Sequence, residues 1–192
     1  MTPRSRRALQ PKLPIWIGLA GSPESAARAG SMGLPMIVGL IGGLPSDVAP
    51  GFRAYRAAAQ AAGHDPATLG TGTSSHMHVA PTSQGARETF YQHYAHYLAY
   101  LSRGRFRVSR EAYELAASPR GALYVGSPQE IIDKALAQHE LFGHSRILGR
   151  MDIGALPYPA LSRSVELFAN EVAPALRKAT ADEADDAAAV SG

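Results

Sequence analysis

Residues 14–43 read PIWIGLAGSPESAARAGSMGLPMIVGLIGG and contain one complete strand–helix–strand unit. Residues 15–20 and 36–41 are short apolar runs bounded by proline and glycine, which is typical of buried strands. Between them Ser22 and Pro23 begin a helix, because serine caps the first turn and proline fits the first helical position. This order predicts two parallel strands joined by a right-handed crossover.

The same alternation continues along the rest of the chain. We expect further strands at residues 71–79 and 146–153, and helices at residues 46–62, 82–101, 110–117, 127–142 and 159–178. Four strands, each followed by a helix, predict an α/β fold with a parallel sheet and flanking helices. The helical region between the third and fourth strands is longer than one crossover requires, which indicates an insertion.

Composition excludes several classes of protein. The 192 residues include no cysteine, so disulfides, thiolate metal sites and a cysteine nucleophile are excluded. The net charge is only +3, and the dense basic segment at residues 103–110 is typical of a solvated loop, so no nucleic-acid partner is expected. Glycine and proline interrupt every apolar run well before the ~20 residues of a membrane helix. We therefore expect no membrane partner and a cytoplasmic location.

The composition also suggests where the domain begins and ends. Residues 1–12 form a basic N-terminal segment, and residues 13–179 carry the strand and helix pattern of one domain. Residues 180–192 are rich in acidic residues and alanine, and we expect a disordered tail there.

The loop after the first strand has the features of a phosphate site. Free backbone N–H groups and the positive end of the helix dipole favour an anion at residues 21–25. Gly21 permits close approach of the backbone, and the hydroxyls of Ser22 and Ser25 can donate to anionic oxygens. Neither nucleotide-binding glycine pattern is present, so an ordinary capped helix stays an alternative. Gly42 and Gly43, after the second strand, either leave room for a ligand or only turn the chain.

Polar side chains alternate along the third strand. Ser74, His76 and His78 share one face, which we expect to point away from the flanking helices. His93 and His96 share a face of the next helix, and with the strand pair they would make a four-histidine metal site in a hydrolase. No acidic ligand lies at metal-binding spacing, which favours histidines that are merely hydrogen-bonded.

Several segments together resemble one known family, the luciferase-like flavin-dependent monooxygenases. They are LPIWIG at residues 13–18, AGSPESAARAG at 20–30, GLPM at 33–36, AGHD at 62–65, VGSPQE at 125–130, and ELF with EVAP within 166–174. The resemblance covers roughly residues 13–178. It implies a (β/α)8 TIM barrel, of which this chain resembles the C-terminal half, strands five to eight.

The resemblance implies an enzyme, a flavin-dependent monooxygenase or oxidoreductase that uses reduced FMN or F420 on a small organic substrate. It places His76 in the active site as the catalytic residue, and it places the following residues at the flavin: Gly21, Ser22, Ser25, Leu40, Gly42 and Gly43. Four strands cannot close an eight-stranded barrel. The expected partner is therefore a second copy in a homo-oligomer or a complementary N-terminal half-barrel. A non-catalytic or truncated half-barrel that acts only within an assembly is the alternative.

Overall fold

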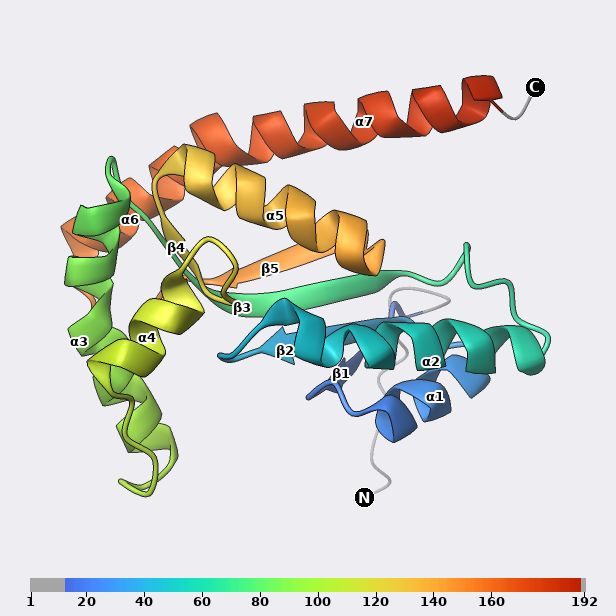
Figure 1. Cartoon of the computed structure of the whole chain (residues 1–192), viewed down its shortest axis with the longest axis horizontal. Coiled ribbons are helices and arrows are strands. Elements are labelled where there is room, and N and C mark those ends of the chain that lie inside the picture. Colours follow the sequence, from blue (N-terminus) through green and yellow to red (C-terminus); the bar gives the residue numbers. More distant parts are fainter. Residues whose placement is uncertain (1–12, 191–192) are drawn as a thin grey trace, which may run out of the picture.

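The computed structural model describes residues 13–190 and shows a parallel β-sheet with helices packed on its outer face (Figure 1). Its strands are β1 (Ile17–Leu19), β2 (Met36–Leu40), β3 (Thr71–Val79), β4 (Tyr124–Gly126) and β5 (Arg146–Arg150). Strand β2 pairs with β1 and β3, β5 pairs with β3, and every pairing is parallel. The order β1–β2–β3–β5 is that of half a (β/α)8 barrel, as the sequence predicts.

Seven α-helices cover or cap the described part of this sheet. They are α1 (Pro23–Ser31), α2 (Ala49–Ala61), α3 (Ser83–Leu101), α4 (Arg110–Ala117), α5 (Pro128–Phe142), α6 (Tyr158–Leu167) and α7 (Ala173–Val190). A 3-10 turn, Pro45–Val48, precedes α2, and a π-helical turn, Phe168–Val172, joins α6 to α7. Helices α3 and α4 stand across the carboxyl end of the sheet, at the left of Figure 1.

Helix starts follow the capping signals in the sequence. The Ser22 hydroxyl accepts a hydrogen bond from the Ser25 N–H at 3.3 Å, and the Ser127 hydroxyl accepts one from the Glu130 N–H at 3.4 Å. These side chains satisfy backbone donors that the first helical turn leaves free. Gly143 ends α5 in the left-handed conformation, with φ +58°.

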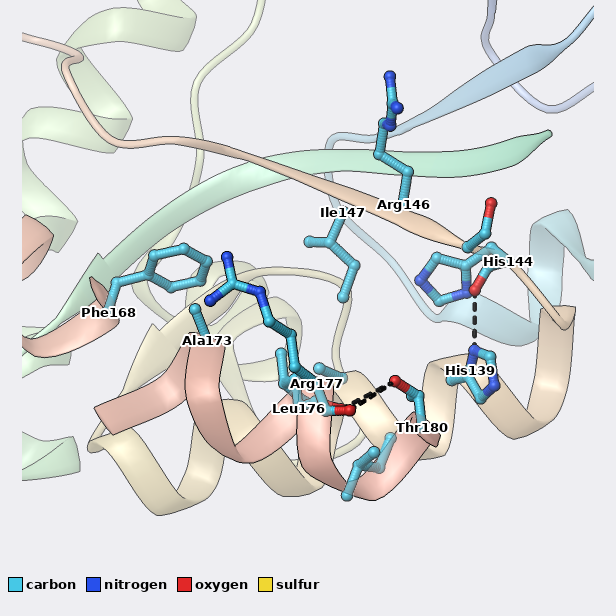
Figure 2. Close-up of a pocket in the computed structure, with 12 residues that line it drawn as sticks. His139, His144, Arg146, Ile147, Phe168, Ala173, Leu176, Arg177 and Thr180 are labelled. Carbon is cyan, nitrogen blue, oxygen red and sulfur yellow. Dashed lines mark hydrogen bonds between the residues drawn. The ribbon is translucent and has the colours of Figure 1, made fainter. Parts of the chain in front are cut away.

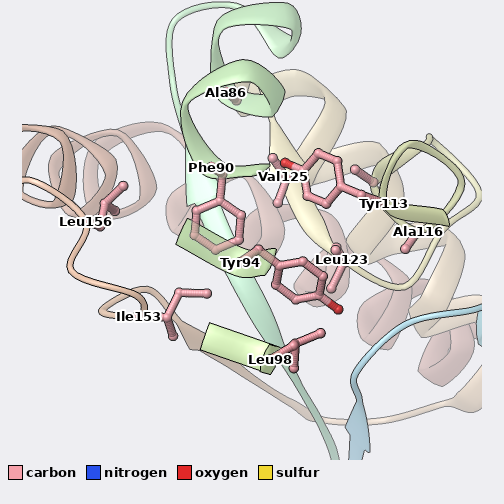
Figure 3. Close-up of a cluster of buried hydrophobic side chains, with 11 residues drawn as sticks. Ala86, Phe90, Tyr94, Leu98, Tyr113, Ala116, Leu123, Val125, Ile153 and Leu156 are labelled. Carbon is pink, nitrogen blue, oxygen red and sulfur yellow. The ribbon is translucent and has the colours of Figure 1, made fainter. Parts of the chain in front are cut away.

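The core consists of three apolar clusters. One joins α1 and α2 to β1 and β2, and a second joins α5 and the α6–α7 region to β3, β4 and β5. The third fills the space among α3, α4 and β4 and is rich in aromatic rings (Figure 3). Helices α1 and α2 approach closely at Gly30, where a Cβ would lie 2.2 Å from the Tyr55 carbonyl oxygen. Only glycine fits this crossing.

The structure corrects the expected number of strands. Residues 124–126 form β4 and pair with Met77, His78 and Val79 of β3, in a region where the sequence pattern predicts only a helical insertion. All three residues of β4 are buried. A short strand buried on both faces has no polar–apolar alternation, so periodicity cannot reveal it.

The ends of the chain were expected to be a basic N-terminal segment and a disordered acidic tail. Helix α7 continues to Val190, past residue 178 and into the segment expected to be a disordered tail. The basic segment, residues 1–12, lies outside the described residues, as do residues 191–192. Between residues 13 and 190, no helix is both long and apolar enough to span a membrane.

Candidate functional site

The inner face of the sheet is built in layers by the strand register. Ser74 pairs with Gly39 on β2 and with Leu148 on β5, and one step nearer the carboxyl end His76 pairs with Arg150. Met77 and Val79, which alternate with these residues, pack in the cluster below the helices. Because side chains alternate across a strand, Ser74, His76 and their partners point to the opposite, inner face. The polar stripe of β3 therefore points away from α5 and α7, as expected, but helix α3 covers its His76 and His78 end.

Part of this inner face is open. Ile41 and Leu148 are 50% and 42% exposed, and a Cβ at Gly18 would meet nothing within 4 Å. Gly18 and Gly39 contribute no side chain to this face, whereas their register partners Ile37 and Ser74 do, and we refer to this area as the floor.

His76 lies at the covered end of the inner face. Its ring is 1% exposed and makes edge contacts with the rings of Tyr94 and Tyr97 on α3, with both centroid distances 5.3 Å. Neither ring nitrogen forms a hydrogen bond, and the buried Nε of Arg150 also has no partner. Burial, helped by the Arg150 charge, lowers the pKa of His76 to about 4. The imidazole is neutral at pH 7, and both of its buried nitrogens lack a hydrogen-bond partner.

Tyr94 connects His76 to the end of β2. Its hydroxyl donates to the Ile41 carbonyl and lies 3.9 Å from the position a Cβ on Gly42 would take. Burial raises the pKa of Tyr94 to about 12, so the hydroxyl stays protonated. Figure 3 shows the Tyr94 ring within the same aromatic cluster as Phe90 and Tyr113.

The loop at residues 21–25 lies at the carboxyl end of β1, next to the end of β2. Gly21 has φ +96°, and a Cβ there would lie 2.7 Å from Val48 Cγ1, so glycine is required. Ser22 is exposed and Ser25 half-buried at the start of α1. Gly42 and Gly43 are exposed at the neighbouring strand end. We refer to Gly21, Ser22, Ser25, Gly42 and Gly43 together as the rim.

Leu40 is placed differently from the rim. Its side chain is buried with Met36 and Val38 in the cluster below α1 and α2. It points away from the inner face, so only its backbone borders the open surface. Apolar residues run through this strand without interruption, and the sequence pattern does not tell one face from the other.

The four histidines of the metal alternative do not converge. The ring of His78 stacks on Phe90 with a centroid distance of 5.4 Å, and His93 Nδ1 forms a 2.7 Å hydrogen bond with the Gly154 carbonyl oxygen. Within the described part of the chain, no three His, Cys, Asp or Glu side chains are grouped so that they could hold a metal ion.

Sequence reasoning missed Arg150, Tyr94 and Tyr97. In the sequence Arg150 and Asp152 alternate on one strand face, a pattern that predicts only that the two charges neutralise each other. The structure instead pairs Arg150 with His76 across two strands, and no ion pair joins Arg150 to Asp152. Tyr94 and Tyr97 are three residues apart on α3, a spacing that predicts a shared helix face but not which surface it covers.

The geometry is that of a (β/α)8 half-barrel with an open inner face and a glycine-rich rim. The family model for luciferase-like monooxygenases matches residues 1–145, which is most of the chain. The chain therefore belongs to the luciferase-like monooxygenase family. No curated protein matches it.

Solved structures of similar fold include enzymes with two kinds of flavin. The monooxygenase RslO1 from Streptomyces bottropensis shares 25% identity with a TM-score of 0.71, covering 89% of this chain and 50% of RslO1. The oxygenating constituent of 3,6-diketocamphane monooxygenase from Pseudomonas putida was solved in complex with FMN. It shares 22% sequence identity with this chain at a TM-score of 0.63, and the match covers 84% of this chain and 48% of that protein. The coenzyme F420-dependent tetrahydromethanopterin reductase from Methanopyrus kandleri shares 17% sequence identity at a TM-score of 0.60, and the match covers 84% of this chain and 50% of the reductase. The chain thus spans about half the length of these proteins.

Proposed function

We propose that this chain is the flavin-binding half of a luciferase-like oxidoreductase, a flavin-dependent monooxygenase that uses reduced FMN or F420 on a small organic substrate. The observation that carries the proposal is the pairing of His76 with Arg150 on the inner face. Both side chains present buried nitrogen atoms without hydrogen-bond partners. Buried polar groups that a chain leaves unpaired are costly, and a bound ligand would satisfy them.

The rim fits the phosphate of such a cofactor. Gly21 brings the backbone close to the start of α1, where the helix dipole favours an anion. The Ser22 oxygen is already an acceptor for the Ser25 N–H, so its hydrogen can point outward to a phosphate oxygen. Gly42 and Gly43 leave the neighbouring strand end free of side chains. Glu24, in the first turn of α1, opposes an anion here and provides a test of the site.

The ring of the cofactor fits the floor beside Gly39 and Ser74. When bound, reduced flavin would supply the electrons that activate molecular oxygen, which is the oxidant of the substrate. His76 is neutral and can hold or pass a proton at either ring nitrogen, and Arg150 supplies positive charge next to it. Tyr94 and Tyr97 keep water from His76, which makes its interactions stronger than in bulk solvent.

The open inner face and the free edges of the sheet favour a protein partner that covers them. Within the described residues, β1 pairs only with β2 and β5 only with β3, which leaves two sheet edges and exposed Ile41 and Leu148. Edges and apolar faces of this kind associate unless they are covered. We propose that a complementary N-terminal half-barrel covers them, and a second copy of the chain is the alternative occupant. The same observation favours the second candidate function, a non-catalytic half-barrel that acts only within an assembly.

Flavin titration of charge variants tests the cofactor site. Ser25→Asp places a carboxylate at the N-terminus of α1, where it favours the helix dipole but repels a phosphate. We expect at least tenfold weaker binding of FMN or F420 with an unchanged or higher melting temperature. Ser31→Asp adds the same charge at the other end of α1 and should leave binding unchanged. Glu24→Gln should tighten binding. Equal effects of Ser25→Asp and Ser31→Asp would contradict the rim as the phosphate site.

Light scattering coupled to size-exclusion chromatography tests the assembly. The purified chain should elute as a dimer or larger species, or as a complex with a co-expressed N-terminal half-barrel. A stable monomer that binds flavin would rule out obligatory pairing. An assembled protein that binds neither FMN nor F420 would favour the non-catalytic subunit instead.

A further inference from the structure

A cavity lies away from the rim and the inner face. It has a volume of about 730 Å³ and is lined by the end of α5, the start of β5 and the first turns of α7 (Figure 2). Ile147, which lines it, belongs to the apolar cluster on the helix-covered side of the sheet. Ser145 and Arg146 stand at the amino end of β5, whereas the rim stands at the carboxyl ends of parallel strands. Strand β5 therefore separates this cavity from the proposed flavin site.

The cavity has an apolar part and a polar part. Ile147, Phe168 and Leu176 provide apolar walls, whereas His144, Ser145 and Thr180 provide polar groups. Figure 2 shows Phe168 and Ala173 at one end and His144 and Thr180 at the other. The volume is that of a site for a small organic molecule. A molecule that fits both parts has an apolar body and polar ends.

The charge of the lining favours an anion. Arg177 extends its guanidinium along the cavity in Figure 2, and no ion pair with a described residue neutralises it. No aspartate or glutamate is among the described residues that line the cavity. The guanidinium of Arg146 is turned away, because it lies 4.6 Å from the centroid of the Trp16 ring. Arg177 is thus the cation that faces a ligand, and a carboxylate is its best partner.

His144 provides the second polar contact. The side chain is 2% exposed, and neither ring nitrogen forms a hydrogen bond. Its ring lies 5.8 Å from the rings of both His139 and Phe142, and its carbonyl oxygen, not its ring, bonds to His139 Nδ1. Burial, helped by the neighbouring His139, lowers the pKa of His144 to about 4, although the Gln138 backbone acts in the opposite direction. A neutral imidazole that lacks partners can exchange a hydrogen bond with a hydroxyl group.

We infer that this cavity binds a small aromatic carboxylate that carries a second polar group. The carboxylate pairs with Arg177, the ring lies against Phe168, Ile147 and Leu176, and the second polar group meets His144. Such a site lies on the outer side of the sheet and is independent of the flavin site. The inference therefore does not rest on the proposed function.

Fluorescence titration with 6-hydroxy-2-naphthoate tests the inference. The full chain should bind this probe saturably, and its neutral amide should bind at least tenfold more weakly, because the charge-assisted pair with Arg177 is lost. Arg177→Gln should weaken binding of the acid about tenfold and leave binding of the amide unchanged. Lys178→Gln removes a neighbouring positive charge outside the cavity and should leave both unchanged.

Two further measurements test the His144 contact and the independence of this cavity from the proposed flavin site. His144→Phe keeps the ring but removes the nitrogens, so it should weaken 6-hydroxy-2-naphthoate several-fold and leave 2-naphthoate, which lacks the hydroxyl, unaffected. Saturating FMN should not displace the probe. Absence of saturable binding, equal effects of Arg177→Gln and Lys178→Gln, or displacement by FMN would overturn the inference. Failure of flavin binding with intact probe binding would refute only the proposed function.

Discussion

Three buried histidines should make the stability of this protein steeply dependent on pH below neutrality. His76, His78 and His144 are each at most 2% exposed, and burial lowers the pKa of each from 6.5 to about 4. In the unfolded chain these side chains protonate near pH 6.5, whereas in the folded chain they stay neutral until about pH 4. Protons therefore favour the unfolded state in this window, and the stabilising contribution is lost as the pH falls.

The magnitude follows from the size of the pKa shift. Each pKa unit corresponds to about 1.4 kcal/mol, so one histidine contributes roughly 3 kcal/mol at pH 7 that is absent below pH 4. Between pH 6 and 5 the unfolded state binds nearly one extra proton per histidine. The three together should lower the free energy of unfolding by about 3 kcal/mol per pH unit. A loss of that size approaches the whole stability of a typical domain within two to three pH units.

Urea denaturation followed by circular dichroism at pH 6.5, 6.0, 5.5 and 5.0 measures this slope. His76→Phe keeps a ring against Tyr94 and Tyr97 but removes one titrating group, so the slope should fall by about a third. His96→Phe makes the same substitution at an exposed position of α3 and should keep the wild-type slope. An unchanged slope in His76→Phe would show that His76 titrates in the folded protein as it does in the unfolded chain, and it would refute the reasoning.

Three further predictions concern other buried contacts. Lys134 donates to the Ala117 and Leu123 carbonyls at 3.1 and 2.7 Å, and burial lowers its pKa to about 8. Stability should therefore rise from pH 8 to 10 by up to about 3 kcal/mol, and urea denaturation of Lys134→Met should show no such rise. Tyr94→Phe removes the hydroxyl that donates to Ile41, so it should cost about 1 kcal/mol in the same assay, while Tyr100→Phe, at an exposed position of the same helix, should cost nothing. Gly30→Ala forces a Cβ against the Tyr55 carbonyl and should lower the free energy of unfolding by about 3 kcal/mol in urea titrations. Gly18→Ala, with open space around the new Cβ, should leave stability unchanged. Equal stability of the two variants would contradict the α1–α2 packing.

The local signals in the sequence were sufficient to predict most of the strands and helices. Ser22 caps the helix that it was expected to cap, and Ser127 and Gly143 cap and end α5 close to the bounds predicted for that helix. The order of strands and helices was predictable because each signal acts within a few residues of the chain. Strand β4 was not, because three buried residues carry no periodicity.

The candidate site could be predicted only in part. Alternation along β3 correctly separated His76 from Met77. The side chain of Leu40 points into the cluster below α1 and α2, which the sequence could not show because an uninterrupted apolar strand has no polar face to mark the inside. Its expected place beside the flavin stays a prediction. The roles of the rim residues and of His76 in binding flavin stay predictions.

The parallel half-barrel, its capped helices and its family can be predicted from the amino-acid sequence alone, because they depend on short-range patterns and on the order of segments. The folded structure was needed to show that Arg150 lies beside His76, that Tyr94 joins His76 to the end of β2, and that Arg177 and His144 line one cavity. These contacts join residues from different strands and helices. They are set by strand register and helix packing, which no local stretch of the chain encodes.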